Sequence, residues 1–245
     1  MKINIKRFNK ELSSNTQLHV FDVHNINLLQ ALIEIKKEID STLTFRCGCK
    51  SGVCGSCAVR VNGIEKLACK TNLNENDFIE PINNSNILKD LVVDVSHETL
   101  LISKLNLTID ANIESIQVSQ EDVKNIDLQS NCILCNSCYS SCPVYDVNKE
   151  FLGPFALTRA LRYVNDKKNA NRLNIIDSIQ TNGVWDCTLC SACTLVCPQG
   201  IDPKADIMQL QNISVQNGYS NPYAQTMDFG MNFNDDFSGF NPNGF

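Results

Sequence analysis

The sequence lacks any long apolar run, any leader-like N-terminus and any excess of basic residues. No window approaches the roughly 18 consecutive apolar residues that a membrane-spanning helix needs, so we expect no segment to cross a bilayer. Residues 1–8 have no apolar stretch followed by small residues, so we expect no signal peptide. The net charge of −6 argues against nucleic acid or an anionic membrane surface as the main partner.

Cysteine, in contrast, is abundant: 13 of the 245 residues are cysteines. They fall in three tight groups, at 47–69, 132–142 and 187–197. A disulfide framework is typical of short secreted chains and would be spread more evenly. The clustering therefore indicates metal binding.

The second and third groups repeat one spacing. Residues 132–143 and 187–198 both read C-x2-C-x2-C-x3-C-P, the run found in bacterial ferredoxins. In two-cluster ferredoxins the fourth cysteine of each run ligates the cluster of the other run. Zinc would explain the C-x2-C pairs, but not the duplicated x3-C-P ending. We therefore predict a pair of iron–sulfur clusters and an electron-carrying protein.

The first group has a different spacing. Cys49, Cys54, Cys57 and Cys69 are separated as C-x4-C-x2-C-x11-C, the plant-type spacing for a [2Fe–2S] cluster. Cys47 does not fit this spacing, and we assign it no role. Glycines at 48, 52 and 55 are expected to let the loop wrap the cluster and direct N–H groups at the sulfurs.

The periodicity of the chain predicts an α+β protein of two domains. Strands are expected at 3–8, 18–23 and 42–45, with a helix at 27–38, which together indicate a β-grasp domain. Helices are expected at 154–165, 171–180 and 203–215, the last with Asp202 as N-cap and Pro203 at its first position. Residues 100–109 fit a strand or a helix.

These elements predict a plant-type ferredoxin domain over 1–97 and an all-helical, bacterial-ferredoxin-like domain over 98–215. Residues 216–245 are rich in Asn, Gly and Phe. This composition predicts a disordered tail or, as the alternative, a segment that becomes ordered against a partner.

The chain as a whole resembles the iron–sulfur subunits of succinate dehydrogenase and fumarate reductase. The resemblance covers about 1–215 and extends beyond the cysteines to Gly-Val-Cys-Gly-Ser-Cys at 52–57, Leu-Ala-Cys-Lys-Thr at 67–71, Lys-Asp-Leu-Val-Val-Asp at 89–94 and Phe-Leu-Gly-Pro at 151–154. It implies a line of three clusters that join a flavoprotein to a membrane subunit handling quinone.

The resemblance also implies ligand sets. Cys49, Cys54, Cys57 and Cys69 correspond to the [2Fe–2S] ligands, and Cys132, Cys135, Cys138 and Cys197 to those of the middle [4Fe–4S] cluster. Cys142, Cys187 and Cys193 correspond to ligands of the third cluster, which is [3Fe–4S] in typical members. FAD is expected on the partner flavoprotein only, and no residue of this chain is expected to be catalytic.

Three positions depart from the typical pattern. Cys190 replaces an aliphatic residue and supplies a fourth thiolate, so we expect a second [4Fe–4S] cluster, with a buried thiol beside a [3Fe–4S] cluster as the alternative. Val147 and Thr188 stand where typical members have quinone-site Trp and His. These departures favour the branch that includes methylmenaquinol:fumarate reductases, in which the third subunit is cysteine-rich.

The sequence therefore predicts an electron-transfer subunit of a fumarate reductase or succinate dehydrogenase complex. A heterodisulfide- or glycolate-type oxidoreductase is the alternative, and a free carrier or a redox sensor is disfavoured by the two-domain frame and the acidic charge. We expect the protein to lie at the cytoplasmic membrane only through a partner. The cytoplasmic side is expected by default, and co-export would place it on the periplasmic side.

Overall fold

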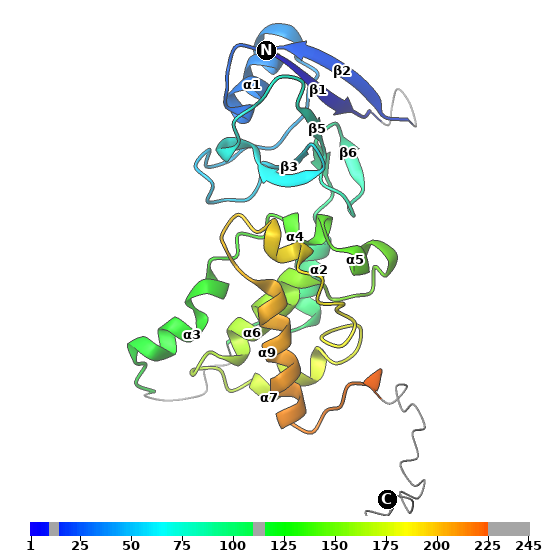
Figure 1. The fold of residues 1–245 in the computed structure, drawn as a ribbon. Coiled ribbons are helices and arrows are strands. Elements are labelled where there is room, and N and C mark those ends of the chain that lie inside the picture. The colour runs from blue at the N-terminus through cyan, green and yellow to red at the C-terminus, as the bar shows by residue number, and fades with distance from the viewer. Residues whose placement is uncertain (10–14, 110–115, 225–245) are drawn as a thin grey trace, which may run out of the picture.

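The computed structural model describes residues 1–9, 15–109 and 116–224. Figure 1 shows two bodies stacked along one axis, with the sheet in the first and helices in the second. The loops of the first body (cyan) face the end of the second body that carries α4 (Ser137–Ser140). Across the described residues, no helix is both long and apolar enough to span a bilayer.

The first body is built on a five-stranded mixed sheet. Its strands are β1 (Lys2–Arg7), β2 (Gln17–Asp22), β3 (Ala58–Val61), β4 (Ile64–Leu67) and β5 (Phe78–Glu80). Their order is β2-β1-β5-β3-β4, with β1 antiparallel to β2 and parallel to β5. A small hairpin of β6 (Ile87–Lys89) and β7 (Val92–Val93) follows. The helix α1 (Leu28–Glu34) packs its buried face against inward residues of β1. This is the β-grasp arrangement that the sequence predicted.

Most of the predicted elements of this domain are present with shifted ends. The strands expected at 3–8 and 18–23 each lie one residue earlier. Asn27 caps α1, and a π-helical turn (Ile35–Ile39) extends it. The strand predicted at 42–45 is wrong, because this segment is irregular: the Thr44 N–H donates to the Asp90 carboxylate (2.8 Å) instead of to a neighbouring strand.

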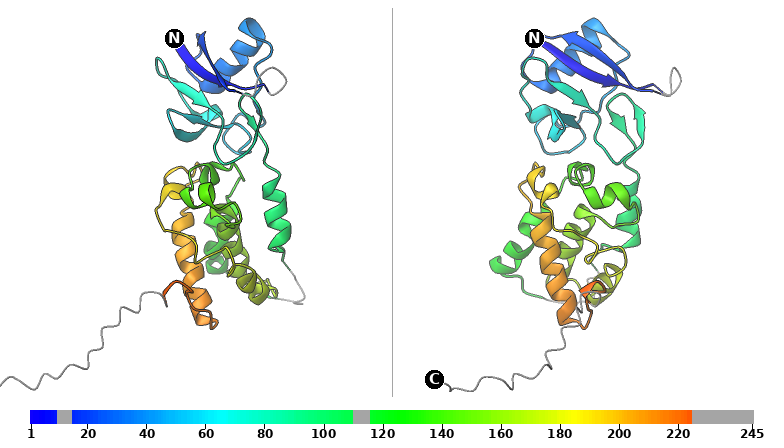
Figure 2. Two further views of the ribbon diagram at one scale, coloured as in Figure 1. Left: turned by 90° about the vertical axis from the view of Figure 1, so that its right-hand side faces the viewer. Right: turned by 45° about the vertical axis from the view of Figure 1, so that its right-hand side comes forward.

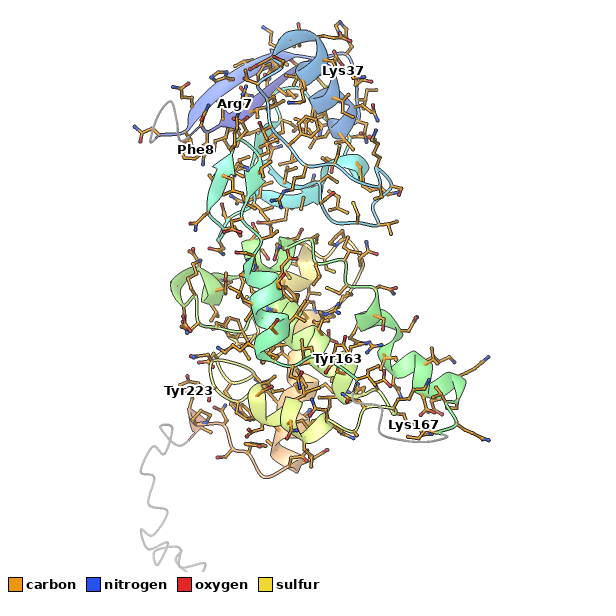
Figure 3. The ribbon with its side chains drawn as sticks, turned by 180° about the vertical axis from the view of Figure 1, so that it is seen from behind. Arg7, Phe8, Lys37, Tyr163, Lys167 and Tyr223 are labelled. Carbon is orange, nitrogen blue, oxygen red and sulfur yellow. The ribbon has the colours of Figure 1, made fainter. Side chains whose placement is uncertain are left out.

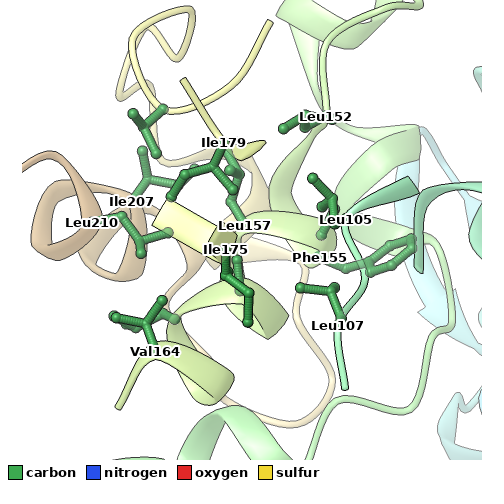
Figure 4. Packing of buried hydrophobic residues seen from close by; sticks show 14 of the residues in the cluster. Leu105, Leu107, Leu152, Phe155, Leu157, Val164, Ile175, Ile179, Ile207 and Leu210 are labelled. Atoms are coloured by element: carbon green, nitrogen blue, oxygen red, sulfur yellow. The ribbon is translucent and has the colours of Figure 1, made fainter. Parts of the chain in front are cut away.

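The second body is helical. Its helices are α2 (His97–Lys104), α3 (Gln120–Ser130), α4, α5 (Pro143–Val147), α6 (Pro154–Val164), α7 (Arg172–Ser178), α8 (Ala192–Leu195) and α9 (Pro203–Gln216). Figure 4 shows the core that they enclose, in which Leu157 of α6 and Leu210 of α9 are fully buried. Since α6 begins at Pro154 and α9 at Pro203, both helices start where the sequence predicted.

The segments of uncertain assignment are resolved in part. Residues 97–104 form a helix, and Leu105 and Leu107 after it are buried in the helical core. The predicted domain boundary at 97/98 falls at the start of this helix. Of the predicted tail, residues 217–224 lie on the helical domain, where Tyr219 donates to Asp177 (2.9 Å). Figures 2 and 3 show where this end of the described chain lies. Residues 225–245 lie outside the described part.

Candidate metal centres

All thirteen cysteines are free thiols. Hydrogen bonds, a shared pocket and mutual effects on pKa associate twelve of them in three sets of four. The first set lies in the β-grasp domain. Cys49 and Cys54 are on the exposed loop before β3, Cys57 is buried at the end of that loop, and Cys69 is buried in the 3-10 turn Ala68–Lys70 that follows β4. The hairpin β3–β4 therefore brings Cys69 back to the loop, since the Ala68 N–H donates to the Cys57 carbonyl (3.0 Å).

Backbone N–H groups of this loop converge on one sulfur. Ser51, Val53 and Cys54 donate to Cys49 Sγ at 3.4, 3.3 and 3.3 Å. The hydrogen bonds of the Ser51 side chain and backbone, joined by that of Val53, lower the pKa of Cys49 to about 5. Burial has the opposite effect on Cys57 and raises its pKa to about 11. A loop that offers several N–H groups to a thiolate fits a plant-type cluster, in which such bonds stabilise negative charge on sulfur.

The loop glycines differ in what they supply. Gly52 and Gly55 have φ of +83° and +71°, which L-residues rarely adopt. Gly48 has no positive φ, but a Cβ there would lie 3.0 Å from Cys54 Sγ. The predicted wrapping role thus has two physical origins, backbone conformation and close packing.

The second set lies at the end of the helical domain that faces the first. Cys132, Cys135, Cys138 and Cys197 line one pocket between the two cysteine runs, together with Phe155 and Pro198. Burial raises the pKa of each of the first three thiols, and the proximity of Cys197 raises it further. The fold therefore brings a cysteine from the second run to three from the first.

The third set contains the unusual cysteine. Burial, together with the neighbouring Cys187, Cys142 and Cys190, raises the pKa of Cys193 to about 12. Cys190 also raises the pKa values of Cys142 and Cys187, so it belongs to the same neighbourhood. Cys193 also raises the pKa of Cys138 in the second set, so the second and third sets are adjacent.

The two runs share one backbone path. Leu134 and Asn136 have positive φ (+53° and +61°), and Leu189 and Ser191 at the matching positions do as well (+55° and +68°). Each run then continues into a four-residue helix, α4 or α8. The last cysteine of each run, before proline, lies near the other run, because Cys197 lines the pocket of Cys132, Cys135 and Cys138, and Cys142 raises the pKa of Cys187.

The second and third sets each combine three cysteines of one run with the last cysteine of the other run, which is the pairing that two-cluster ferredoxins use. Among the described residues, no three His, Cys, Asp or Glu side chains converge closely enough for a single metal ion. The remaining cysteine, Cys47, is exposed at the start of the first loop. Val147 is 85% exposed at the end of α5, and Thr188 is exposed beside Cys187.

Sequence reasoning missed the residues that join the domains. Asn84 Nδ2 donates to the Tyr139 carbonyl (2.8 Å), and Ser140 Oγ donates to Glu65 (2.6 Å). Gln199 Nε2, two residues after Cys197, donates to the Gly52 carbonyl (3.1 Å). Ser140 and Gln199 lie in or beside the cysteine runs, which was the signal for them, whereas Asn84 lies 15 residues after Cys69 and had no such signal.

Comparison with known proteins agrees with this picture. Residues 2–99 match the model of a 2Fe-2S iron-sulfur cluster binding domain, and residues 129–201 match that of a 4Fe-4S dicluster domain. The chain is 35% identical over 234 residues to the fumarate reductase iron-sulfur subunit of Haemophilus influenzae, covering 85% of this chain and 91% of that protein.

Two further comparisons extend this result. The 8-methylmenaquinol:fumarate reductase iron-sulfur subunit of Wolinella succinogenes is 34% identical over 235 residues, covering 89% of this chain and 74% of that protein. A chain of the Mycobacterium smegmatis Sdh1 complex in the apo form has the same fold, with a TM-score of 0.77, 23% identity and coverage of 89% of this chain and 97% of that chain.

Proposed function

The chain belongs to the iron–sulfur electron-transfer subunits of fumarate reductase and succinate dehydrogenase complexes, and from this premise we propose its ligand sets, third cluster and partners. Cys49, Cys54, Cys57 and Cys69 hold a [2Fe–2S] cluster. The second set (Cys132, Cys135, Cys138 and Cys197) and the third set (Cys142, Cys187, Cys190 and Cys193) each hold a [4Fe–4S] cluster. Bound there, the clusters supply one-electron carriers.

The observation that carries the third-cluster proposal is the position of Cys190. It is near enough to Cys142, Cys187 and Cys193 to raise the pKa of each. A fourth thiolate at this corner supports four irons in place of three. Val147 and Thr188 offer neither an indole N–H nor an imidazole, which favours a methylmenaquinol-type complex over one with the usual quinone pocket at this subunit.

The chain's own role is to hold and tune the clusters. The N–H groups of Ser51, Val53 and Cys54 stabilise charge on Cys49, and burial around Cys57 excludes water. Catalysis belongs to a partner flavoprotein whose FAD interconverts fumarate and succinate. A third, cysteine-rich subunit handles the quinol and attaches the chain to the periphery of the cytoplasmic membrane.

One purification tests the proposed partner complex and the proposed third cluster. The tagged chain is isolated anaerobically from its host in mild detergent, and the eluate is assayed for flavin, for fumarate reduction by reduced viologen and, after air oxidation, by EPR. We expect a flavoprotein partner with fumarate activity and no signal from an oxidised three-iron cluster, because an oxidised [4Fe–4S] cluster is EPR-silent.

The matched control is Cys190→Ala, which removes the fourth thiolate of the third set and is expected to produce the three-iron signal. A three-iron signal in the unaltered protein would overturn the third-cluster proposal. A cysteine-rich or thiol-handling partner without flavin and fumarate activity would instead favour the heterodisulfide- or glycolate-type oxidoreductase.

A further inference from the structure

Gly55 follows Cys54 directly, and it touches the helical domain. A Cβ built on Gly55 would lie 2.7 Å from the Ile133 carbonyl oxygen and 2.9 Å from Cys135 Cβ. Real Cβ atoms essentially never approach other heavy atoms within 3.0 Å, and the Ile133 carbonyl is backbone, so it cannot rotate away. Any residue other than glycine at this position must push the two loops apart.

This contact joins one cysteine of the first set to one of the second. Cys54 and Cys135 both border the space between the domains, together with Gly55 and Ile133. Gly55 is the next residue after Cys54 and packs on Cys135 itself. The size of the residue at position 55 therefore limits how closely the first and second cysteine sets approach each other.

Hydrogen bonds on both sides of the contact keep the loops together. On one side Gln199 Nε2 donates to the Gly52 carbonyl (3.1 Å). On the other side Asn84 Nδ2 donates to the Tyr139 carbonyl (2.8 Å), and the Asn83 N–H donates to Ser140 Oγ (2.7 Å). The domains are thus held face to face around Gly55, and a side chain there cannot be accommodated by free movement of one loop.

We propose that Gly55 is a positioning residue, whose lack of a side chain sets the distance that an electron crosses between the first and second clusters. The transfer moves one electron from the reduced cluster to the oxidised one, with no bond made or broken and no proton moved. This inference rests on the ligand sets proposed above. It assigns to Gly55 a role beyond the turn that its positive φ allows.

Gly63 provides a matched control for that turn. Its φ is +82°, against +71° for Gly55, so alanine imposes comparable backbone strain at both positions. A Cβ on Gly63, however, meets nothing closer than an Arg60 nitrogen at 3.7 Å. Alanine at position 55 therefore collides with the helical domain, whereas alanine at position 63 does not.

The test compares Gly55→Ala with Gly63→Ala in the whole complex. Iron and sulfide content and the EPR signals of the separate clusters show whether both clusters are present. Two measurements then report the distance between the clusters. They are the magnetic interaction between the two reduced clusters and the rate of electron transfer after rapid-freeze reduction. In Gly55→Ala we expect both clusters, a weaker interaction and a several-fold slower transfer, and in Gly63→Ala no change in either.

An unchanged interaction in a fully loaded Gly55→Ala protein would overturn the proposal. If Gly55→Ala loses the first cluster, Asn84→Gly decides, because it removes the bond to Tyr139 while keeping the positive φ of Asn84 (+63°). A weakened interaction in that variant supports the proposal, and an unchanged one contradicts it. Cys54→Ser tests the ligand assignment separately. If that assignment is wrong, the spectrum of the first cluster is unaltered in Cys54→Ser.

Discussion

At the scale of single residues, Asp90 joins three segments of the β-grasp domain. Its carboxylate, 1% exposed, accepts from Arg7 Nε (2.8 Å) and from the N–H groups of Phe8 (3.2 Å) and Thr44 (2.8 Å). Arg7, labelled in Figure 3, also binds Asp40 (2.6 Å). A buried charge of this kind contributes stability only while all its partners remain, because an unpaired buried charge is costly.

Replacing Asp90 by Ala is therefore expected to destabilise this domain strongly. Among the described residues, it leaves the Arg7 guanidinium with Asp40 and Thr42, and it orphans the Thr44 N–H, which should cost about 3–5 kcal/mol. Unfolding in guanidinium, followed by the visible circular dichroism of the first cluster, measures the loss. Asp22→Ala is the control, since that carboxylate is 72% exposed and pairs with the N-terminus. Equal shifts in the two variants would contradict the argument.

At the scale of elements, local signals predicted helix starts well. The Asp202-Pro203 pair placed the start of α9, where Asp202 accepts from the Ala205 N–H (3.1 Å). Local signals failed at residues 42–45, because the Thr44 N–H donates to a side chain 46 residues away. They did not decide between helix and strand at residues 100–109, because the apolar spacing there fits both periods. The cysteine spacing predicts the ligand sets, because the spacing itself follows from the geometry of the ligands.

The cap of α9 has a second function that the sequence did not indicate. Asp202 Oδ1 also accepts from Thr194 Oγ (2.6 Å), which ties α9 to the helix that carries Cys193. Asp202→Ala should therefore cost about 0.5–2 kcal/mol, as expected for a lost N-cap. The fluorescence of Trp185, the only tryptophan, reports unfolding of this domain.

Ser96→Ala is the matched control for this cap. Ser96 is the N-cap of α2, but its side chain makes no capping hydrogen bond, so we expect little change. If Ser96→Ala destabilised the protein as much as Asp202→Ala, the capping bond would not be the cause.

At the scale of the whole molecule, the interface between the domains depends on residues that sequence patterns do not single out. Ser140 lies between Cys138 and Cys142, yet its hydroxyl bonds across the interface to Glu65, 75 residues away, and to Asn83. Asn84 reaches the Tyr139 carbonyl from the loop between β5 and β6. Periodicity and spacing describe one segment at a time, so contacts of this range become visible only in the folded chain.

Ser140→Ala tests whether this interface is held by polar contacts. The substitution leaves the Asn83 N–H without its acceptor and deprives the buried Glu65 carboxylate of one donor, while Arg60 remains beside it (3.2 Å). We expect a loss of about 1–3 kcal/mol, the usual cost of buried polar groups left unsatisfied. Hydrogen exchange at the Asn83 amide should accelerate with it. Ser141→Ala is the control, because the Ser141 hydroxyl bonds within its own motif, to the Cys138 carbonyl (3.3 Å). Unchanged exchange at Asn83 in Ser140→Ala would show that the Ser140 hydroxyl does not hold the two domains together.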